Sequence, residues 1–331
     1  MSTFLPESGI VLAPLAGGPA TAELAATVTD AGGLGFLAAG YLTPDAFAEQ
    51  VRLARALTGG PLGANLFCLQ EEPVHEEAIA AYAAELAPEA ARLGVELGDP
   101  HFDDDGYAAK LAVVLDEPVE VVSFTFGCPS PEEIGQLQDA GSEAWVTVTS
   151  VAEAVEATAR GADALVVQGS EAGGHRGAWR DDGTDQPLFE LLADVRDACE
   201  TTLVGTGGIG DKAGVLAALD AGASAVQVGT AFLLCPEAGT SEPHRAMLER
   251  PGTTAITRAF TGRRARGIVN EFMREHRYAP SAYPHVHHLT APLRAAARAA
   301  GDAQRINLWA GVRFATARAV PAADVVAALR P

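Results

Sequence analysis

The stretch "TTLVGTGGIGDKAGVLAALDAGASAVQVGTAF" (Thr201–Phe232) contains a short apolar run, a glycine-rich loop, a helical pattern and a second apolar run. Gly205, Gly207 and Gly210 match the G-x-G-x-x-G pattern of a dinucleotide-binding βαβ unit. That unit also needs an acidic residue about 20 positions further on, at the end of the next strand, to bind ribose hydroxyls. Here the next strand ends in Gly229–Thr230, so the sequence argues against a Rossmann dinucleotide site.

The same glycine-rich loop also fails to match a P-loop. Asp211 separates Gly210 from Lys212, and Ala213 occupies the position where Ser or Thr should follow the lysine. Two successive strands that end in glycine are instead typical of the last two units of a (β/α)₈ barrel, where backbone N–H groups form a phosphate site. We expect the phosphate of FMN to bind there. The alternative is that these glycines serve only tight turns.

The alternation of apolar runs and helical patterns extends upstream, which indicates repeated βα units and a parallel sheet. The predicted strands are Ile10–Ala13, Gly35–Ala38, Gly63–Leu66, Val119–Phe124, Ala144–Val148, Ala164–Gln168, Leu203–Gly205 and Ala225–Val228. Helical patterns lie between them at Thr21–Ala31, Pro44–Leu57, Glu77–Leu93, Pro131–Ala140, Val151–Arg160, Phe189–Ala198 and Lys212–Ala221. The sequence therefore predicts an α/β fold, a (β/α)₈ TIM barrel with its active site at the C-terminal ends of the strands.

The alternation stops after residue 242, which predicts a division of the chain. Residues 1–242 are expected to form an FMN-binding barrel. Residues 243–331 contain helical patterns and loops, and we expect a mainly helical lid that covers the substrate site. The alternative is a separate downstream module.

The stretch "VVQGSEAGGHRG" (Val166–Gly177) carries a histidine after the end of a predicted strand. Gly173–Gly174 removes side chains where a planar ligand would lie against the backbone. His175 is then expected to project into the barrel mouth, where an imidazole can move protons near neutral pH. Arg176 beside it would supply a positive charge suited to an anion. The alternative is a histidine that serves packing.

Composition limits the classes of partner. Of the 331 residues, 48% are hydrophobic and 20% are charged, as in a globular protein, and no apolar run reaches the roughly 20 residues of a membrane span. The formal charge of −20 disfavours nucleic acid, because binding of the phosphate backbone requires Lys and Arg. The first residues have no basic region before their apolar stretch, so we expect a cytoplasmic protein.

Other candidate motifs carry less chemistry. The four cysteines are scattered without a CxxC pair, and no G-x-S-x-G motif is present. "GDPHFDDDG" (Gly98–Gly106) lacks the spacing of a calcium loop and is interpreted as a solvated loop. "HVHH" (His285–His288) has no acidic or cysteine partners spaced around it, so a surface loop is favoured over a metal site. We therefore predict no metal.

Several long motifs, in order, resemble the nitronate monooxygenase family, formerly called 2-nitropropane dioxygenases, and in particular its class I branch. They are "APLAGG…TAELAATVTDAGGLGFLAAGYLTP" (Ala13–Pro44), "GANLF" (Gly63–Phe67), "FGCP" (Phe126–Pro129), "QGSEAGGHRG" (Gln168–Gly177), Gly205–Ser241 and "TGRRARGIVN" (Thr261–Asn270). The resemblance implies a flavin-binding barrel with a helical second domain. It also implies oxidation of alkyl nitronates, such as propionate 3-nitronate, by FMN and O₂ to a carbonyl compound and nitrite.

The resemblance also assigns site residues. It implies that His175 is the active-site histidine, which takes the α-proton of a nitroalkane or orients and charge-balances a nitronate. The residues that it implies for FMN binding are Asn65, Gln168, Gly173, Gly208, Gln227, Val228, Gly229 and Thr230. The cofactor would carry the redox step, while the protein supplies position and electrostatics.

Two other functions remain open at this point. A flavin-dependent enoyl-acyl-carrier-protein reductase has a related barrel and a similar "GGH" loop, but it needs NAD(P)H and a basic surface, for which the region Arg258–Arg266 is the candidate. A flavin-binding sensor without turnover is the non-catalytic alternative, against which His175 argues. The sequence leaves open the physiological substrate, the use of NAD(P)H, the oligomeric state and the motion of the lid.

Overall fold

The barrel strands run through both halves of the chain. The computed structural model describes residues 4–181 and 185–331. Within these residues, eight parallel strands form one sheet in the order β1-β9-β8-β6-β5-β4-β3-β2. They are β1 (Ile10–Leu12), β2 (Gly35–Ala38), β3 (Leu62–Phe67), β4 (Val121–Thr125), β5 (Glu143–Val148), β6 (Ala164–Gln168), β8 (Thr202–Thr206) and β9 (Ala225–Val228). A parallel bridge between Val11 and Leu34 links the two edges, so the predicted (β/α)₈ barrel is confirmed.

The strands could be recognised because both of their faces are buried. In β1, Ile10 and Leu12 pack outward against the helices, while Val11 points into the barrel interior. The interior cluster also contains Phe36 and Trp145, whose ring centroids lie 6.0 Å apart. Strands buried on both faces appear as continuous apolar runs rather than as alternating patterns.

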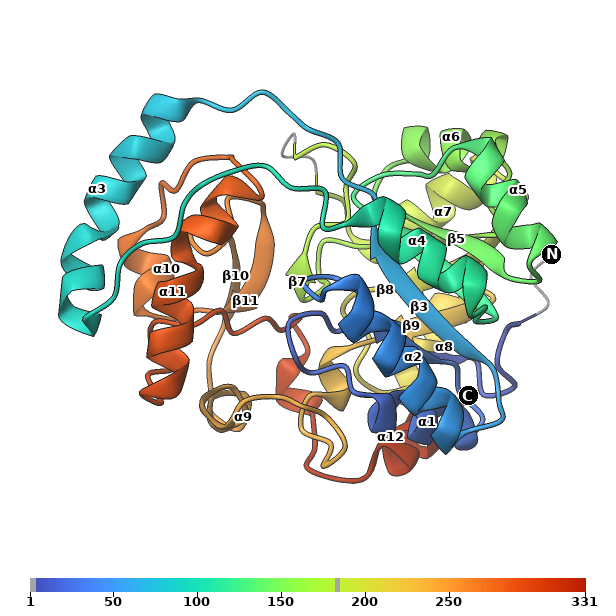
Figure 1. Ribbon diagram of the computed structural model, residues 1–331. Helices are drawn as coiled ribbons and strands as arrows, with labels where there is room; N and C mark the ends of the chain where they lie inside the picture. Colours follow the sequence, from blue (N-terminus) through green and yellow to red (C-terminus); the bar gives the residue numbers. More distant parts are fainter. Residues whose placement is uncertain (1–3, 182–184) are drawn as a thin grey trace.

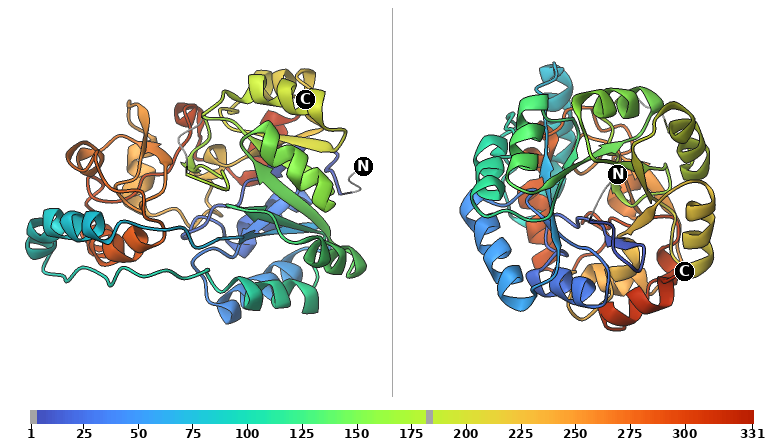
Figure 2. Two further views of the ribbon diagram at one scale, coloured as in Figure 1. Left: turned by 90° about the horizontal axis from the view of Figure 1, so that it is seen from above. Right: turned by 90° about the vertical axis from the view of Figure 1, so that its right-hand side faces the viewer.

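A ring of helices surrounds the barrel, as the end-on view of Figure 2 shows. The helices are α1 (Ala22–Asp30), α2 (Pro44–Leu57), α4 (Tyr107–Asp116), α5 (Pro131–Asp139), α6 (Val151–Arg160), α7 (Leu188–Ala198), α8 (Lys212–Asp220) and α12 (Ala322–Leu329). Several begin after a residue whose side chain accepts a hydrogen bond from the first turn: Thr21, Thr43, Ser130, Ser150 and Asp211. These N-caps fix where each loop becomes helix.

The helical pattern after β3 does not lie on the barrel as the βα alternation had predicted. α3 (Glu76–Leu93) packs against α11 (His285–Ala299), away from the barrel, as Figure 1 shows. Its buried face, which includes Tyr82 and Leu86, joins Leu289 and Leu293 in a separate core. The barrel position is taken by α4, which packs on α2 and β3 and which is not among the predicted helices. Periodicity predicts a helix but not the surface that it covers.

The division of the chain at residue 242 also differs from the arrangement found. α12, near the C-terminus, returns to the barrel and packs against α1 and α8. The second region contains α9 (Glu242–Leu248) and α10 (Glu271–Glu275) besides α3 and α11, so it draws on both sides of residue 242. We call this second region, residues 69–104 and 242–311, the lid.

The lid is not only helical. Its β10 (Thr254–Thr257) and β11 (Ala265–Ile268) form an antiparallel sheet with β7 (Gly174–His175), which belongs to the loop after barrel strand β6. The lid is thus joined to the barrel by backbone pairing. Among the described residues, no helix is long and apolar enough to cross a membrane.

Candidate active site

A cavity of about 370 Å³ lies at the C-terminal ends of the barrel strands, beneath the lid. The predicted catalytic histidine and the predicted FMN-binding residues all line this one cavity: Asn65, Gln168, Gly173, His175, Gly208, Gln227, Val228, Gly229 and Thr230. The parallel strands bring these residues together because their carboxyl ends meet at one rim. The cavity is therefore the candidate active site.

The backbone of His175 is part of the sheet shared by barrel and lid. His175 pairs with Ala265, and Gly174 pairs with Arg266, across β7 and β11. Gly174 has φ +77°, a left-handed conformation that glycine adopts without a steric penalty. The glycine before the histidine thus allows the turn that leads the loop into the lid sheet.

The imidazole of His175 lies in a cage of aromatic rings. The ring centroids of Phe126, Tyr283 and Trp309 lie 5.8, 5.6 and 5.5 Å from that of His175. Its Nε2 lies 2.9 Å from the hydroxyl oxygen of Thr261. Tyr283, Trp309 and Thr261 all belong to the lid, so the lid completes the surroundings of a histidine that the barrel loop supplies.

The cage sets the charge of the histidine. Burial, together with the nearby guanidinium groups of Arg263 and Arg294, lowers the pKa of His175 to about 3. Arg263 is buried and lies over the face of Phe126, with its guanidinium carbon 4.3 Å from the ring centroid. The imidazole is therefore neutral near pH 7, which is the form that can accept a proton.

Gln168 holds the histidine loop from inside. Its Nε2 donates to the carbonyl oxygen of His175 at 3.1 Å, and its Oε1 accepts from Arg176 and from the backbone N–H of Gly177. Most of the hydrogen bonds of the Gln168 side chain therefore go to residues 175–177 of the loop. Gln168 still lines the cavity, where the remaining N–H of its amide group is available to a ligand.

Arg176 does not supply a charge to the cavity, contrary to the sequence interpretation. Its side chain is only 1% exposed, donates to the carbonyl oxygens of Gln168 and Gly169, and pairs with Asp185 at 2.9 Å. A buried guanidinium that is paired in this way braces the loop. Arg176 follows His175 in the sequence, but this does not show that its side chain points away from the barrel mouth.

The glycines of the site allow close packing of neighbouring backbone segments as well as access for a ligand. A Cβ on Gly173 would lie 2.4 Å from the backbone nitrogen of Gly311 and 2.5 Å from the carbonyl carbon of Ala310. Gly208 has φ +70°, and a Cβ there would lie 2.9 Å from that of Glu171. These positions exclude side chains because the lid and the neighbouring loop approach their backbone closely.

Two amide side chains present unused acceptors at the cavity. Asn65 is 2% exposed and donates from Nδ2 to Ser123 and Thr125; within the described parts of the chain, its hydrogen bonds use only that nitrogen. Gln227 is 7% exposed, and its buried Oε1 has no hydrogen-bond partner among the described residues. A buried polar atom without a partner is costly unless a ligand satisfies it.

Sequence reasoning missed the lid residues at the cavity. Trp309, His244, Asn307 and Arg298 line it, and so does Tyr41 from the loop after β2. Tyr41 lies within the motif Ala13–Pro44, whereas the four lid residues stand in no motif, so only the folded chain shows their position. His244 is buried, and this burial lowers its pKa to about 4.

The "HVHH" segment is not a surface loop as predicted. It forms the first turn of α11, and His287 stacks on Tyr41 with ring centroids 4.4 Å apart and planes 4° apart. Burial lowers the pKa of His287 to about 2. The prediction failed because the ring that covers His287 comes from a distant part of the sequence.

Comparison with known proteins identifies the family of the chain. The family model described as nitronate monooxygenase matches residues 1–331. The nitronate monooxygenase of Paraburkholderia phytofirmans is 38% identical over 97% of this chain and 90% of its own, and that of Pseudomonas aeruginosa is 38% identical over 97% and 94%.

Solved structures give the same result. The nitroalkane oxidase from Streptomyces ansochromogenes is 51% identical, covers 99% of this chain and 96% of its own, and superimposes with a TM-score of 0.96. FabK from Thermotoga maritima, at 24% identity, covers 98% of this chain and 92% of its own with a TM-score of 0.77, which shows a shared fold. The chain therefore belongs to the nitronate monooxygenase family and is a flavin-dependent oxidoreductase that acts on nitronates.

Proposed function

We propose that the chain uses FMN to oxidise alkyl nitronates, such as propionate 3-nitronate, with O₂ to a carbonyl compound and nitrite. The observation that carries the proposal is the single cavity that gathers His175 and every expected FMN-binding residue beneath the lid. His175 is proposed as the catalytic residue.

The residues of the cavity fit FMN. Gly208, Gly229 and Thr230 follow the last two barrel strands, where their backbone N–H groups would hold the phosphate. Asn65, Gln168, Gly173, Gln227 and Val228 would contact the rest of the cofactor. The unpartnered Oε1 of Gln227 is an acceptor that suits a hydroxyl or N–H donor of the flavin. When bound, FMN supplies the redox chemistry with the nitronate and O₂.

The electrostatics of the cage bear on the role of His175. A pKa of about 3 keeps the imidazole neutral at pH 7, so its free ring nitrogen can accept a hydrogen bond or a proton, although so low a pKa makes it a weak base. It would take the α-proton of a nitroalkane, whereas a nitronate has already lost that proton and needs only orientation. The positive field of Arg263 and Arg294 favours the anion in both cases.

The proposal is tested on the purified protein. We expect an FMN absorption spectrum and O₂ uptake with propionate 3-nitronate. With a neutral nitroalkane, which still carries its α-proton, His175→Ala should lower turnover by about 100-fold or more, while His75→Ala, an exposed substitution ahead of α3, should leave it unchanged. Bound FMN without turnover would refute the substrate, and failure to bind FMN after reconstitution would refute the whole proposal.

The alternative function, that of an enoyl-acyl-carrier-protein reductase, needs a basic surface on which the acidic carrier protein can dock. The candidate region does not provide one, because Arg258 and Arg264 both pair with Asp181 and Arg263 is buried. Anaerobic flavin reduction separates the two functions. We expect fast reduction by a nitronate and slow reduction by NADH and NADPH, and the reverse order would favour the reductase.

A further inference from the structure

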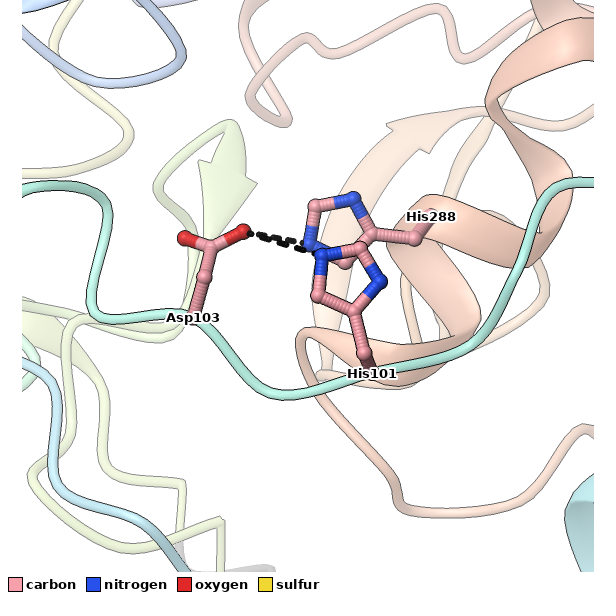
Figure 3. A group of neighbouring side chains, drawn as sticks. All are labelled: His101, Asp103 and His288. Atoms are coloured by element: carbon pink, nitrogen blue, oxygen red, sulfur yellow. Dashed lines mark ion pairs between the residues drawn. The ribbon is translucent and has the colours of Figure 1, made fainter.

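Three side chains with metal-ligand chemistry meet on the flank of the lid. Figure 3 shows His101 and Asp103, from the segment between α3 and α4, facing His288 from the first turn of α11. The sequence predicts a solvated loop for one segment and a surface loop for the other, without a metal. Only the fold brings them together.

The ligand atoms lie close enough to share one ion. Nε2 of His288 is 2.7 Å and Nε2 of His101 is 3.8 Å from the same oxygen, Oδ2 of Asp103. All three ligand atoms lie within 4.8 Å of one another. Around a tetrahedral Zn²⁺ with bonds near 2.0–2.2 Å, ligand atoms are roughly 3.3 Å apart, a value that lies between the two distances to Asp103.

The neighbours of these groups leave the ligand atoms free. Nδ1 of His101 lies 2.9 Å from the carbonyl oxygen of Asp99, which only accepts hydrogen bonds. Nδ1 therefore carries the proton, and Nε2 keeps its lone pair, the arrangement found behind metal-bound histidines. The backbone N–H of Asp105 donates to Oδ1 of Asp103 at 2.7 Å and so orients the other oxygen, Oδ2, toward the two rings.

His288 also directs a ring nitrogen at Asp103. Its Nε2 is buried and lies 2.7 Å from Oδ2 of Asp103. The rings of His101 and His288 stack with centroids 4.1 Å apart, which brings their Nε2 atoms to the same side of Asp103.

We propose that His101, Asp103 and His288 form a binding site for a divalent transition-metal ion such as Zn²⁺, with water as the remaining ligand. Two imidazoles and one carboxylate suit Zn²⁺ and its neighbours rather than Mg²⁺ or Ca²⁺, which prefer oxygen ligands. His101 and Asp103 are about half exposed, so an ion reaches the site from solvent.

A metal here would act on one wall of the active-site cavity. Asp105, which orients Asp103, also accepts from the backbone N–H of Tyr41 at 2.9 Å. Tyr41 lines the cavity and stacks on His287, the neighbour of His288. The ion would thus tie the segment before α4 to the lid helix and stabilise the contact between Tyr41 and His287.

A second group, Glu89, Glu275 and His276, also has metal-ligand atoms within reach of one another. It is a weaker candidate, because the guanidinium of Arg305 pairs with Glu89 at 3.2 Å and with Glu275 at 3.2 Å. That positive charge already satisfies the carboxylates.

Calorimetric titration of the chelator-treated, FMN-loaded protein with ZnCl₂ tests the proposal. We expect one site, a higher Tm with Zn²⁺, and, with Co²⁺, the visible absorption bands of a nitrogen-ligated ion. His101→Ala should weaken Zn²⁺ binding at least tenfold and abolish the Tm shift. His75→Ala and Glu275→Gln should bind Zn²⁺ as the unchanged protein does.

Asp103→Asn provides an independent variant, because its amide oxygen still accepts from Asp105 while the negative charge is lost. It should also weaken binding at least tenfold. The proposal would be overturned if the unchanged protein bound no Zn²⁺ at about 100 µM metal, a concentration that would half-fill even a weak site with a Kd of about 100 µM. If His101→Ala and Asp103→Asn bound Zn²⁺ as tightly as the unchanged protein, the proposal would be overturned as well. Neither result depends on turnover of a nitronate.

Discussion

The imidazole Nε2 of His175 lies 2.9 Å from the hydroxyl oxygen of Thr261. Thr261 precedes β11, where Ala265 pairs with the backbone of His175 itself. The lid therefore holds both the ring and the main chain of the histidine that the barrel loop carries. Positioning of the imidazole in this protein is a property of the contact between two regions and not of the barrel alone.

Thr261→Val should lower kcat/KM for a nitronate about tenfold, because a hydrogen bond of this kind contributes about 0.5–1.5 kcal/mol. Thr261→Ser keeps the hydroxyl and should retain most of the activity. As a positioning effect, the loss should appear in kcat and in the pH profile, with FMN affinity unchanged. Equal activity of the Val and Ser variants would show that the hydroxyl does not orient His175.

Buried neutral histidines should make the protein sensitive to acid. The pKa of His244 is lowered from 6.5 to about 4 in the folded state, so below pH 6.5 the unfolded chain binds the extra proton. This contribution to stability is complete above pH 6.5. It is lost by about 1.4 kcal/mol per pH unit as the pH falls toward 4.

Urea unfolding at pH 7.5, 6.0 and 5.0 measures this effect. His244→Gln removes the titrating group, so its free energy of unfolding should fall less steeply with pH than that of the unchanged protein. His75→Ala, at an exposed position, should follow the unchanged protein. Identical slopes for His244→Gln and the unchanged protein would mean that His244 is not held neutral.

Gly173→Ala should destabilise the contact between lid and barrel. The added Cβ would meet backbone atoms of Ala310 and Gly311, which cannot rotate away as a side-chain end can. We expect a loss of about 1–3 kcal/mol in the free energy of unfolding. Gly135→Ala, in α5, meets no atom within 4 Å and should instead stabilise the helix by about 1 kcal/mol. A Gly173→Ala variant as stable as the unchanged protein would show that the lid segment can shift.

The barrel could be predicted from the sequence because its signals are local. Each strand is buried on both faces and appears as an apolar run, as in Ala164–Gln168. Helix starts such as Thr43 and Ser130 carry their own caps. The expected site residues could be placed together because parallel strands end at one rim, and resemblance selected among the residues there.

The rest depends on contacts between distant segments. The helical pattern of Glu76–Leu93 is the same whether its apolar face meets the barrel or α11, so the pattern did not predict that α3 leaves the barrel. His287 is buried because Tyr41 covers it, and His101 gains its partner only when α11 is in place. Trp309 and Tyr283 enclose His175 without any motif of their own.

Replacing Arg176 tests whether this residue stabilises the loop after β6 or binds the anionic substrate. An arginine that binds the anionic substrate would, when replaced, raise KM and leave stability nearly unchanged. The contacts of Arg176 with Gln168, Gly169 and Asp185 predict the opposite. Arg176→Ala removes the arginine donor to the carbonyl oxygens of Gln168 and Gly169, of which Gly169 keeps the backbone N–H of Ala172. It also removes one of the two arginine partners of Asp185.

We therefore expect Arg176→Ala to lower the free energy of unfolding by about 1–3 kcal/mol, the range for leaving a buried acceptor without its donor, because Asp185 keeps Arg264 as a partner. Arg52→Ala is the matched control. Arg52 also pairs with a carboxylate, that of Glu117 at 2.7 Å, but it is exposed, so its loss should cost less than about 1 kcal/mol. Urea unfolding measures both variants. If Arg176→Ala left stability unchanged and raised KM, the loop would not depend on Arg176 for its stability. The anion-binding role of Arg176 would then be favoured.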